Sequence, residues 1–228
     1  MQINKKVFTD DDVSLLMKLM SVNTTTPMEC EAGYNIKKAQ EIYLNAAQKV
    51  GLRKIYFDAP DKQVLKEDLT PISVIDCYKK NPQTFLKTQP NLVLKLGNNN
   101  NSSRTILFNF HMDTVSGYTL PQKIDHKIYG RGAIDNKGPG VALLAGIREA
   151  LKRNPSLLGN ISIIIESVSG EEGGAMGIYG SKYLRKVGNW SGKLNVVCEP
   201  TNNRYFDSTT ATMTLQVEIQ GKGATDDS

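Results

Sequence analysis

Four short segments of the chain combine one histidine with several carboxylates. They are HMDTV at residues 111–115, GRGAIDNKG at 130–138, SGEEGG at 169–174 and CEPT at 198–201. Each follows or precedes an apolar stretch that predicts a buried strand or helix. Acids brought together in one fold would raise each other's pKa values, and bound cations remove that penalty. The set therefore predicts a metal site, and two metal ions are the simplest explanation of its size.

The first segment pairs His111 with Asp113 directly after the apolar run TILFNF. Residues two apart in an extended chain point to the same side, so both side chains can reach one site. His111 would give one ring nitrogen to a metal while Asp113 accepts the proton on the other. Taken alone, the pair equally fits a surface histidine beside a loop acid.

In the second segment, Asp135 lies among Gly130, Gly132 and Gly138, directly before a long helical pattern. Glycines allow the backbone to come close to an ion. The two oxygens of a carboxylate can bridge two cations, which a lone imidazole cannot do. The alternative for an isolated acid in this position is an ordinary helix cap.

The last two segments place acids after apolar runs. Glu171 and Glu172 follow IIIESVS, and Glu199 follows the run at 194–198. Strand ends in an α/β sheet are where sites assemble. One of two adjacent acids can bind metal while its neighbour takes a proton from water, although each acid alone also fits an exposed turn. Oxygen and imidazole donors without thiolates suit Zn²⁺, with Co²⁺ or Mn²⁺ as alternatives.

The elements that must position these groups alternate between strand and helix patterns. Helices are expected near 10–20, 34–50, 138–153 and 179–187, with a loose one at 72–80, and strands near 52–57, 91–96, 105–110, 161–165 and 194–198. The strands at 91–96 and 105–110 are expected to pair through the polar loop GNNNNSSR, and those at 161–165 and 194–198 to be buried. The pattern predicts an α/β fold with a mostly parallel or mixed central sheet flanked by helices.

The end of the chain changes character. Apolar residues at 213, 215, 217 and 219 alternate with polar ones, which predicts a strand with one face exposed to solvent. This strand is expected to begin a second domain, so residues 1–209 and 210–228 are assigned to different domains.

Bulk properties exclude several classes of protein. The chain has 228 residues, 39% of them hydrophobic, and its net charge of +5 is scattered rather than gathered in a basic block. Nucleic acid is therefore not expected as a partner. Cys30, Cys77 and Cys198 form neither a disulfide framework nor a C-x-x-C pair. No signal peptide or membrane span is evident, so a cytoplasmic protein is expected.

All four segments, in this order, resemble the co-catalytic zinc aminoacylase and carboxypeptidase family, the group of acetylornithine deacetylase and succinyl-diaminopimelate desuccinylase. The resemblance extends from the N-terminal helix to the last residue. It implies that residues 1–209 form the N-terminal portion of a zinc-peptidase-like catalytic domain that lacks its C-terminal segment. Residues 210–228 would then begin an α+β lid and dimerisation domain, through which a homodimer could form.

The resemblance also implies a ligand set. His111 and Glu199 resemble the ligands of one zinc, Asp135 the bridge between two zinc ions, and Glu172 a ligand of the other. The final histidine ligand of the second zinc comes, in the family, from a segment beyond this chain. His126 falls in a turn where the family commonly has glycine, and it is not assigned as a ligand.

The remaining roles come from the same resemblance. Glu171 resembles the general base and Asp113 the residue that orients the histidine. The family places a cis peptide bond after the bridging acid, which would be Asp135–Asn136 here. Thr225 stands where many members have a lid-domain histidine that assists a partner subunit, so another group replaces it or that role is lost.

The implied activity is hydrolysis of the linear amide bond of an N-acyl amino acid by a zinc-activated water. Glu199 resembles the deacylase and carboxypeptidase branches, whereas dipeptidase and tripeptidase branches usually have Asp. The substrate would be a small N-acyl amino acid or a short peptide. A carboxypeptidase or dipeptidase of the same family is the first alternative, and a non-catalytic binding or regulatory protein that retains the fold is the second.

Overall fold

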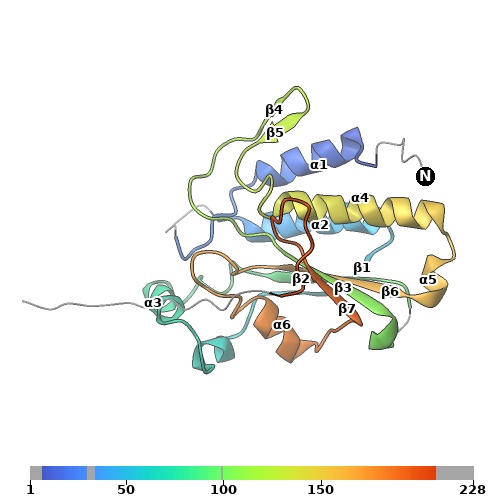
Figure 1. The fold of residues 1–228 in the computed structure, drawn as a ribbon. Helices are drawn as coiled ribbons and strands as arrows, with labels where there is room; N and C mark the ends of the chain where they lie inside the picture. The colour runs from blue at the N-terminus through green and yellow to red at the C-terminus, as the bar shows by residue number, and fades with distance from the viewer. Residues whose placement is uncertain (1–6, 30–33, 99, 209–228) are drawn as a thin grey trace, which may run out of the picture.

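A mixed sheet of five strands forms the centre of the molecule, and helices cover both of its faces (Figure 1). The structure is a computed structural model that describes residues 7–29, 34–98 and 100–208. Its helices are α1 Asp10–Met20, α2 Ile36–Lys49, α3 Ile72–Lys80, α4 Lys137–Arg153, α5 Leu157–Asn160 and α6 Ser181–Val187. Its strands are β1 Arg53–Asp58, β2 Asn91–Leu96, β3 Thr105–His111, β4 Gln122–Ile124, β5 Lys127–Tyr129, β6 Ser162–Val168 and β7 Leu194–Val197. The α/β fold class expected from the sequence is confirmed.

The strands of the main sheet follow the order β1-β2-β6-β3-β7. β6 lies in the middle, antiparallel to β2 and parallel to β3, and β7 is also parallel to β3. Every residue of β6 is buried, as the continuous apolar run predicts for a strand covered on both faces. Since β3, β6 and β7 are parallel, their carboxyl ends meet at one edge of the sheet.

The predicted pairing of the strands at 91–96 and 105–110 is wrong. β6 lies between them, so Ile165 is opposite Leu94 on one side and opposite Phe108 on the other. All six residues of β2 are buried, and a strand buried in this way needs a neighbour along each edge. The long apolar strand β6 fills that position, while the polar loop after β2 leads into the short 3₁₀ helix Ser102–Arg104 before β3 begins.

α1 starts with a reciprocal cap. The backbone N–H of Asp12 donates to Thr9 Oγ1 over 3.4 Å, and the backbone N–H of Thr9 donates to Asp12 Oδ2 over 2.7 Å. This capping box satisfies two N–H groups that have no partner within the helix. The same carboxylate binds Arg148 of α4, with Nη2 and Oδ2 2.7 Å apart. The cap therefore also joins α1 to α4.

Helices α1, α2 and α4 cover one face of the sheet (Figure 1). The ring of Tyr43 on α2 packs edge-on against Phe110 of β3, with centroids 4.9 Å apart, and its hydroxyl donates to the carbonyl oxygen of Gly140 over 2.9 Å. A Cβ at Gly140 would lie 2.5 Å from Phe110 Cε2. Glycine at this position lets the start of α4 approach the end of β3.

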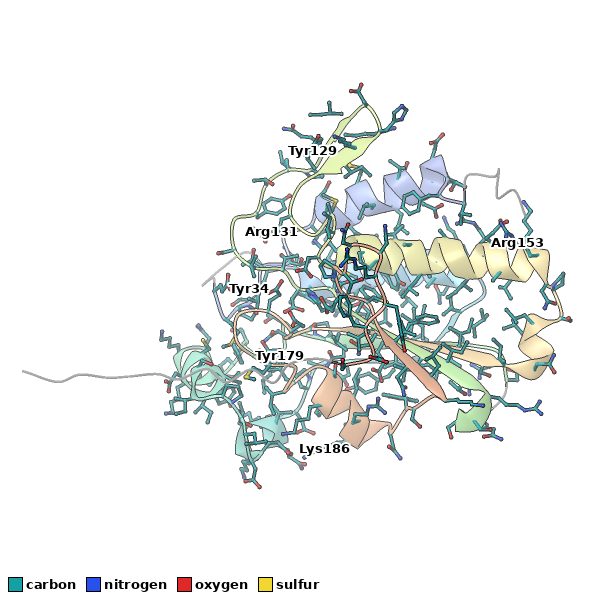
Figure 2. The ribbon with its side chains drawn as sticks, viewed as in Figure 1. Tyr34, Tyr129, Arg131, Arg153, Tyr179 and Lys186 are labelled. Carbon is teal, nitrogen blue, oxygen red and sulfur yellow. The ribbon has the colours of Figure 1, made fainter. Side chains whose placement is uncertain are left out.

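Helix α6 lies on the other side of the sheet (Figure 1). Leu184 of α6 packs in a cluster with Val93, Leu107 and Ile164 of the sheet. Lys186, labelled on α6 in Figure 2, forms an ion pair with Glu67. The two layers thus enclose the sheet except at its edges.

β7 departs from the expectation of a buried strand. Leu194 is 51% exposed and Val197 is 64% exposed. Within the described residues β7 pairs with β3 alone, so it forms an edge of the sheet. A short apolar run does not by itself distinguish a central strand from such an edge.

The hairpin of β4 and β5 projects beyond α1 and carries Tyr129, which is 48% exposed (Figures 1 and 2). Of the residues that the structure covers, none belongs to a helix with both the length and the apolar character of a membrane span. The expected strand at 213–219, the domain boundary at 209, Thr225 and Cys30 lie outside the described residues.

Candidate metal centre

Three parallel strand ends bring the predicted acids and the histidine to one edge of the sheet. His111 is the last residue of β3, and Glu199 follows β7. Glu171 and Glu172 follow β6 in a tight turn. In that turn Gly170 has a φ of +78°, and a Cβ there would lie 1.9 Å from Tyr179 Cε2. Only glycine fits both the backbone conformation and the space.

Asp135 reaches the same edge from the start of α4. The peptide bond between Asp135 and Asn136 is cis, as the resemblance implies. The carboxylate of Asp135 points at the imidazole of His111, with Oδ1 and Nε2 2.8 Å apart. The glycine-rich segment and the strand end therefore meet, although they are separated in the sequence.

The ring of His111 is held at both nitrogens and is 1% exposed. Its Nδ1 lies 2.9 Å from the backbone oxygen of Asp113, whereas the carboxylate oxygen Oδ1 of Asp113 lies 3.7 Å away. The closest acceptor is thus the carbonyl rather than the carboxylate that the sequence suggested. When Nε2 gives up its proton, a ring that donates from Nδ1 directs the lone pair of Nε2 toward the acids, which is the arrangement of a metal-binding histidine.

Asp113 is fully buried next to this ring. Its Oδ2 accepts a hydrogen bond from the backbone N–H of Glu172 over 3.1 Å, and its Oδ1 has no hydrogen-bond partner among the described residues. Asp113 therefore connects the histidine to the turn that carries the acid pair. Its negative charge favours a cation, either a proton or a metal ion, on the His111 side.

Two groups of side chains have donor atoms that all lie within 4.8 Å of one another: His111 with Asp135 and Glu199, and His111 with Glu171 and Glu172. The first group contains the residues expected around one zinc. The second contains the expected ligand Glu172 together with the expected base Glu171. All five metal-facing side chains that the sequence singled out are thus brought together.

Crowding of acids shifts the pKa values of this cluster. Burial raises the pKa values of Glu172 and Glu199, the nearby carboxylates of Glu171 and Asp135 also raise them, and His111 lowers them, which leaves a pKa of about 7 for each. Burial also raises the pKa of Glu171. These acids lie in an environment that disfavours several uncompensated negative charges.

The histidine shows the opposite effect. Burial lowers the pKa of His111, but the adjacent carboxylates of Asp113 and Asp135 outweigh it and raise the pKa to about 11. The hydrogen bond to His111 in turn lowers the pKa of Asp135. The cluster therefore holds a positive charge strongly at the position of the Nε2 proton. Imidazole and carboxylate donors around such a position fit a divalent transition-metal ion.

Two residues that sequence reasoning did not single out hold Asp135 in place. Lys137 is 1% exposed, and its Nζ donates to the carbonyl oxygens of Leu19 and Val22 at the end of α1, over 3.1 and 3.0 Å. Asn136 Nδ2 donates to the carbonyl oxygen of Cys198, next to Glu199. Only their position directly after Asp135 could have indicated this role. A lysine next to a polar loop is normally predicted to be exposed to solvent.

The fold and the site together define an α/β domain with a candidate metal centre at the carboxyl ends of its parallel strands. The sequence model of Peptidase family M20/M25/M40 matches residues 107–220, which are half of the chain. The chain belongs to this family. The match includes the four segments that carry the site.

Curated relatives agree with this assignment. The chain is 32% identical over 151 residues to a LysW-lysine/LysW-ornithine hydrolase of Saccharolobus islandicus, a match that covers 62% of the chain and 41% of the relative. It is 38% identical over 87 residues to a succinyl-diaminopimelate desuccinylase of Rhodospirillum centenum, covering 36% of the chain and 21% of the relative. The matched segments thus cover less than half the length of these relatives.

Solved structures share the fold. An M20 family metallo-carboxypeptidase from Sulfolobus solfataricus superposes with a TM-score of 0.55 at 18% identity, covering 83% of this chain and 37% of that one. The aminopeptidase PepT from Bacillus cereus gives a TM-score of 0.52 at 20% identity, covering 84% of this chain and 44% of that one. At these identities the similarity concerns the fold alone.

Proposed function

We propose that the complete protein is a metal-dependent hydrolase that cleaves the linear amide bond of an N-acyl amino acid. The observation that carries the proposal is the convergence of His111 with Asp135, Glu171, Glu172 and Glu199 at the carboxyl edge of the sheet. The names of the matched relatives, a hydrolase of LysW-linked lysine and ornithine and a desuccinylase, support this class of substrate.

The proposed cofactor is a pair of Zn²⁺ ions, with Co²⁺ or Mn²⁺ as alternatives. His111, Asp135 and Glu199 would hold one ion, and Asp135 would bridge it to the other, held by Glu172. Bound ions of this kind polarise a substrate carbonyl and lower the pKa of a water molecule toward about 7.

Glu171 is the proposed general base. Its Oε2 lies 3.9 Å from His111 Nε2, its side chain is half exposed, and burial raises its pKa above the ordinary value. A carboxylate with a raised pKa accepts a proton more readily near neutral pH. Glu171 would take a proton from the attacking water and deliver it to the leaving amine. Asp113 would hold the orientation of His111 meanwhile.

The remaining proposals concern the whole protein. We propose that the described region is part of the catalytic domain and that residues 210–228 begin a lid and dimerisation domain. An apolar cavity of about 700 Å³ between α4 and the sheet, with Glu199 at its border, supports packing of a further segment there. The free thiols of Cys77 and Cys198 are compatible with the proposed cytoplasmic location.

The test uses the full-length protein and the variant Glu171→Gln, which keeps the shape of the side chain but cannot accept the proton. We expect unchanged metal content and a loss of turnover on N-acetyl amino acids of about 10² to 10⁴-fold. Glu41→Gln, at an exposed acid on α2, is the matched control and should leave turnover unchanged. Turnover of Glu171→Gln at the parental rate would show that Glu171 is not the base.

The same assay separates the alternatives. Dipeptides offered beside N-acetyl amino acids distinguish a peptidase from a deacylase by the product released. If metal-replete protein hydrolyses neither class, the non-catalytic alternative holds instead.

A further inference from the structure

A second cavity, of about 440 Å³, lies near the ends of the strands opposite to those that carry the metal centre. Thr105, the first residue of β3, lines it, whereas His111 at the metal centre is the last residue of the same strand. Trp190, from the connection between α6 and β7, lines another side. The metal centre contributes no residue to this cavity, so its chemistry must be considered separately.

Two cations line the cavity from neighbouring strands. Lys95 of β2 and Arg53 of β1 are directly opposite each other in the strand register. Like charges in directly opposite positions destabilise a sheet. Within residues 7–29, 34–98 and 100–208, neither forms an ion pair with a carboxylate. Their hydrogen-bond partners are neutral amide oxygens, that of Asn100 for Lys95 at 2.6 Å and that of Asn98 for Arg53 at 2.9 Å.

Lys95 is unusual for its strand. It is 9% exposed, while Leu92, Val93, Leu94 and Leu96 make the rest of the strand after its first residue apolar. Burial and the charge of Arg53 both lower the pKa of Lys95. A cation that is partly removed from water, without a partner charge and with a like charge opposite it, costs stability. An apolar residue at this position would stabilise the fold more than a lysine does. A negatively charged ligand from outside the chain would compensate the charge of Lys95.

The rest of the cavity wall is suited to an oxyanion. No Asp or Glu lines it. Ser102 and Ser191 lie on the wall, and in the part of the chain that the structure describes neither hydroxyl bonds to another side chain. Hydroxyl groups and a guanidinium fork are strong donors to phosphate oxygens. The volume exceeds that of one anion and leaves room for an organic group beside the indole of Trp190.

We propose that this cavity binds a phosphate group, carried by inorganic phosphate or by a small phosphomonoester. The ammonium of Lys95 and the guanidinium of Arg53 neutralise the charge of the phosphate, and the hydroxyls of Ser102 and Ser191 donate to its oxygens. A dianion resolves the repulsion between the two opposed cations, which a neutral ligand does not. The site is independent of the proposed hydrolase activity.

Trp190 is the only tryptophan of the sequence, so its fluorescence reports directly on the cavity. The experiment titrates the metal-free chain with sodium phosphate and, in parallel, with sodium chloride at matched ionic strength. We expect a saturable change in emission with phosphate and none with chloride. Glycerol 3-phosphate, compared with glycerol, shows whether a phosphomonoester binds more tightly than the inorganic ion.

The variant Lys95→Met removes the buried charge and keeps the length of the side chain. It should weaken phosphate binding by about tenfold or more, the factor that corresponds to one charge-assisted hydrogen bond. Lys54→Met removes an exposed cation from the same pair of strands that does not line the cavity, and it should bind like the parent. Arg53→Met is the second test and should also weaken binding by about tenfold.

Two results would overturn the proposal. One is a phosphate titration that gives no saturable change beyond that of chloride. The other is parental affinity in both Lys95→Met and Arg53→Met. Circular dichroism of each variant verifies folding, and Lys95→Met should be at least as stable as the parent without ligand because it removes the repulsion with Arg53.

Discussion

Replacing Asp12 by asparagine tests how α1 is attached to α4, the helix that begins directly after the metal-facing loop. Asp12 is 3% exposed, and its carboxylate accepts hydrogen bonds from Arg148 Nη1 over 2.8 Å and Nη2 over 2.7 Å. It also accepts from the backbone N–H and the hydroxyl of Thr9. In Asp12→Asn, an amide NH₂ would face donors where an acceptor is needed.

The magnitude follows from the pKa of this carboxyl group. Burial raises the pKa, but the bonds from Arg148 and Thr9 outweigh burial and lower it from 3.8 to about 2. At about 1.4 kcal/mol per pH unit, that difference corresponds to about 2 to 3 kcal/mol. The side chain of Arg148 is 39% exposed, so solvent reduces the value. We expect Asp12→Asn to lower the free energy of unfolding by about 1 to 2 kcal/mol at neutral pH.

The pH dependence has a definite sign. A carboxyl group whose pKa is lower in the folded state contributes its full stabilisation above the unfolded pKa of 3.8 and loses it as the pH falls toward about 2. The difference between parent and Asp12→Asn, measured by urea unfolding, should therefore be constant near neutral pH and shrink below about pH 4. Asp11→Asn, at an exposed neighbour in the same helical turn, is the control. Equal stabilities of Asp12→Asn and Asp11→Asn would refute this account of the α1–α4 connection.

Two further predictions concern the packing and the metal centre. Gly140→Ala should destabilise the fold by about 1 to 3 kcal/mol, because the new Cβ would lie 2.5 Å from Phe110 Cε2. Gly146→Ala, in the same helix with nothing within 4 Å, is its control in thermal unfolding. The affinity for Zn²⁺ should fall most steeply below about pH 7, because Glu172 and Glu199, with pKa values of about 7, must then lose their protons in addition to the Nε2 proton of His111. Calorimetric titrations on either side of that pH measure the effect, and equal affinities would contradict it.

Much of the fold follows from local patterns in the sequence. The start of α1 is predicted by acidic residues that precede a set of regularly spaced apolar residues. The end of α4 is predicted by Asn154-Pro155, which cannot continue a helix. Strand order does not follow from such patterns, because the pairing of β2 with β6 rather than with β3 depends on contacts between distant residues. β7 is exposed because it has no second neighbouring strand within the described sheet. Its four-residue sequence does not show how many neighbours the strand has.

The candidate site shows the same division. Its acids and its histidine could be named because their types and their places after apolar runs predict one sheet edge. The contact between His111 Nδ1 and the backbone oxygen of Asp113 could not be predicted from the sequence, because it depends on the local path of the chain. The burial of Lys137 against the carbonyls of α1 was missed for the same reason, since its partners lie far away in the sequence.

The central claim is that His111 and the surrounding carboxylates bind metal. Anomalous diffraction at the zinc absorption edge, from crystals of the full-length protein grown with Zn²⁺, tests it most directly. We predict a peak within coordination distance, about 2.0 to 2.2 Å, of His111 Nε2 and of carboxylate oxygens of Asp135 and Glu199, with a second peak beside Glu172. Zinc-replete crystals with no anomalous peak at His111 would contradict it.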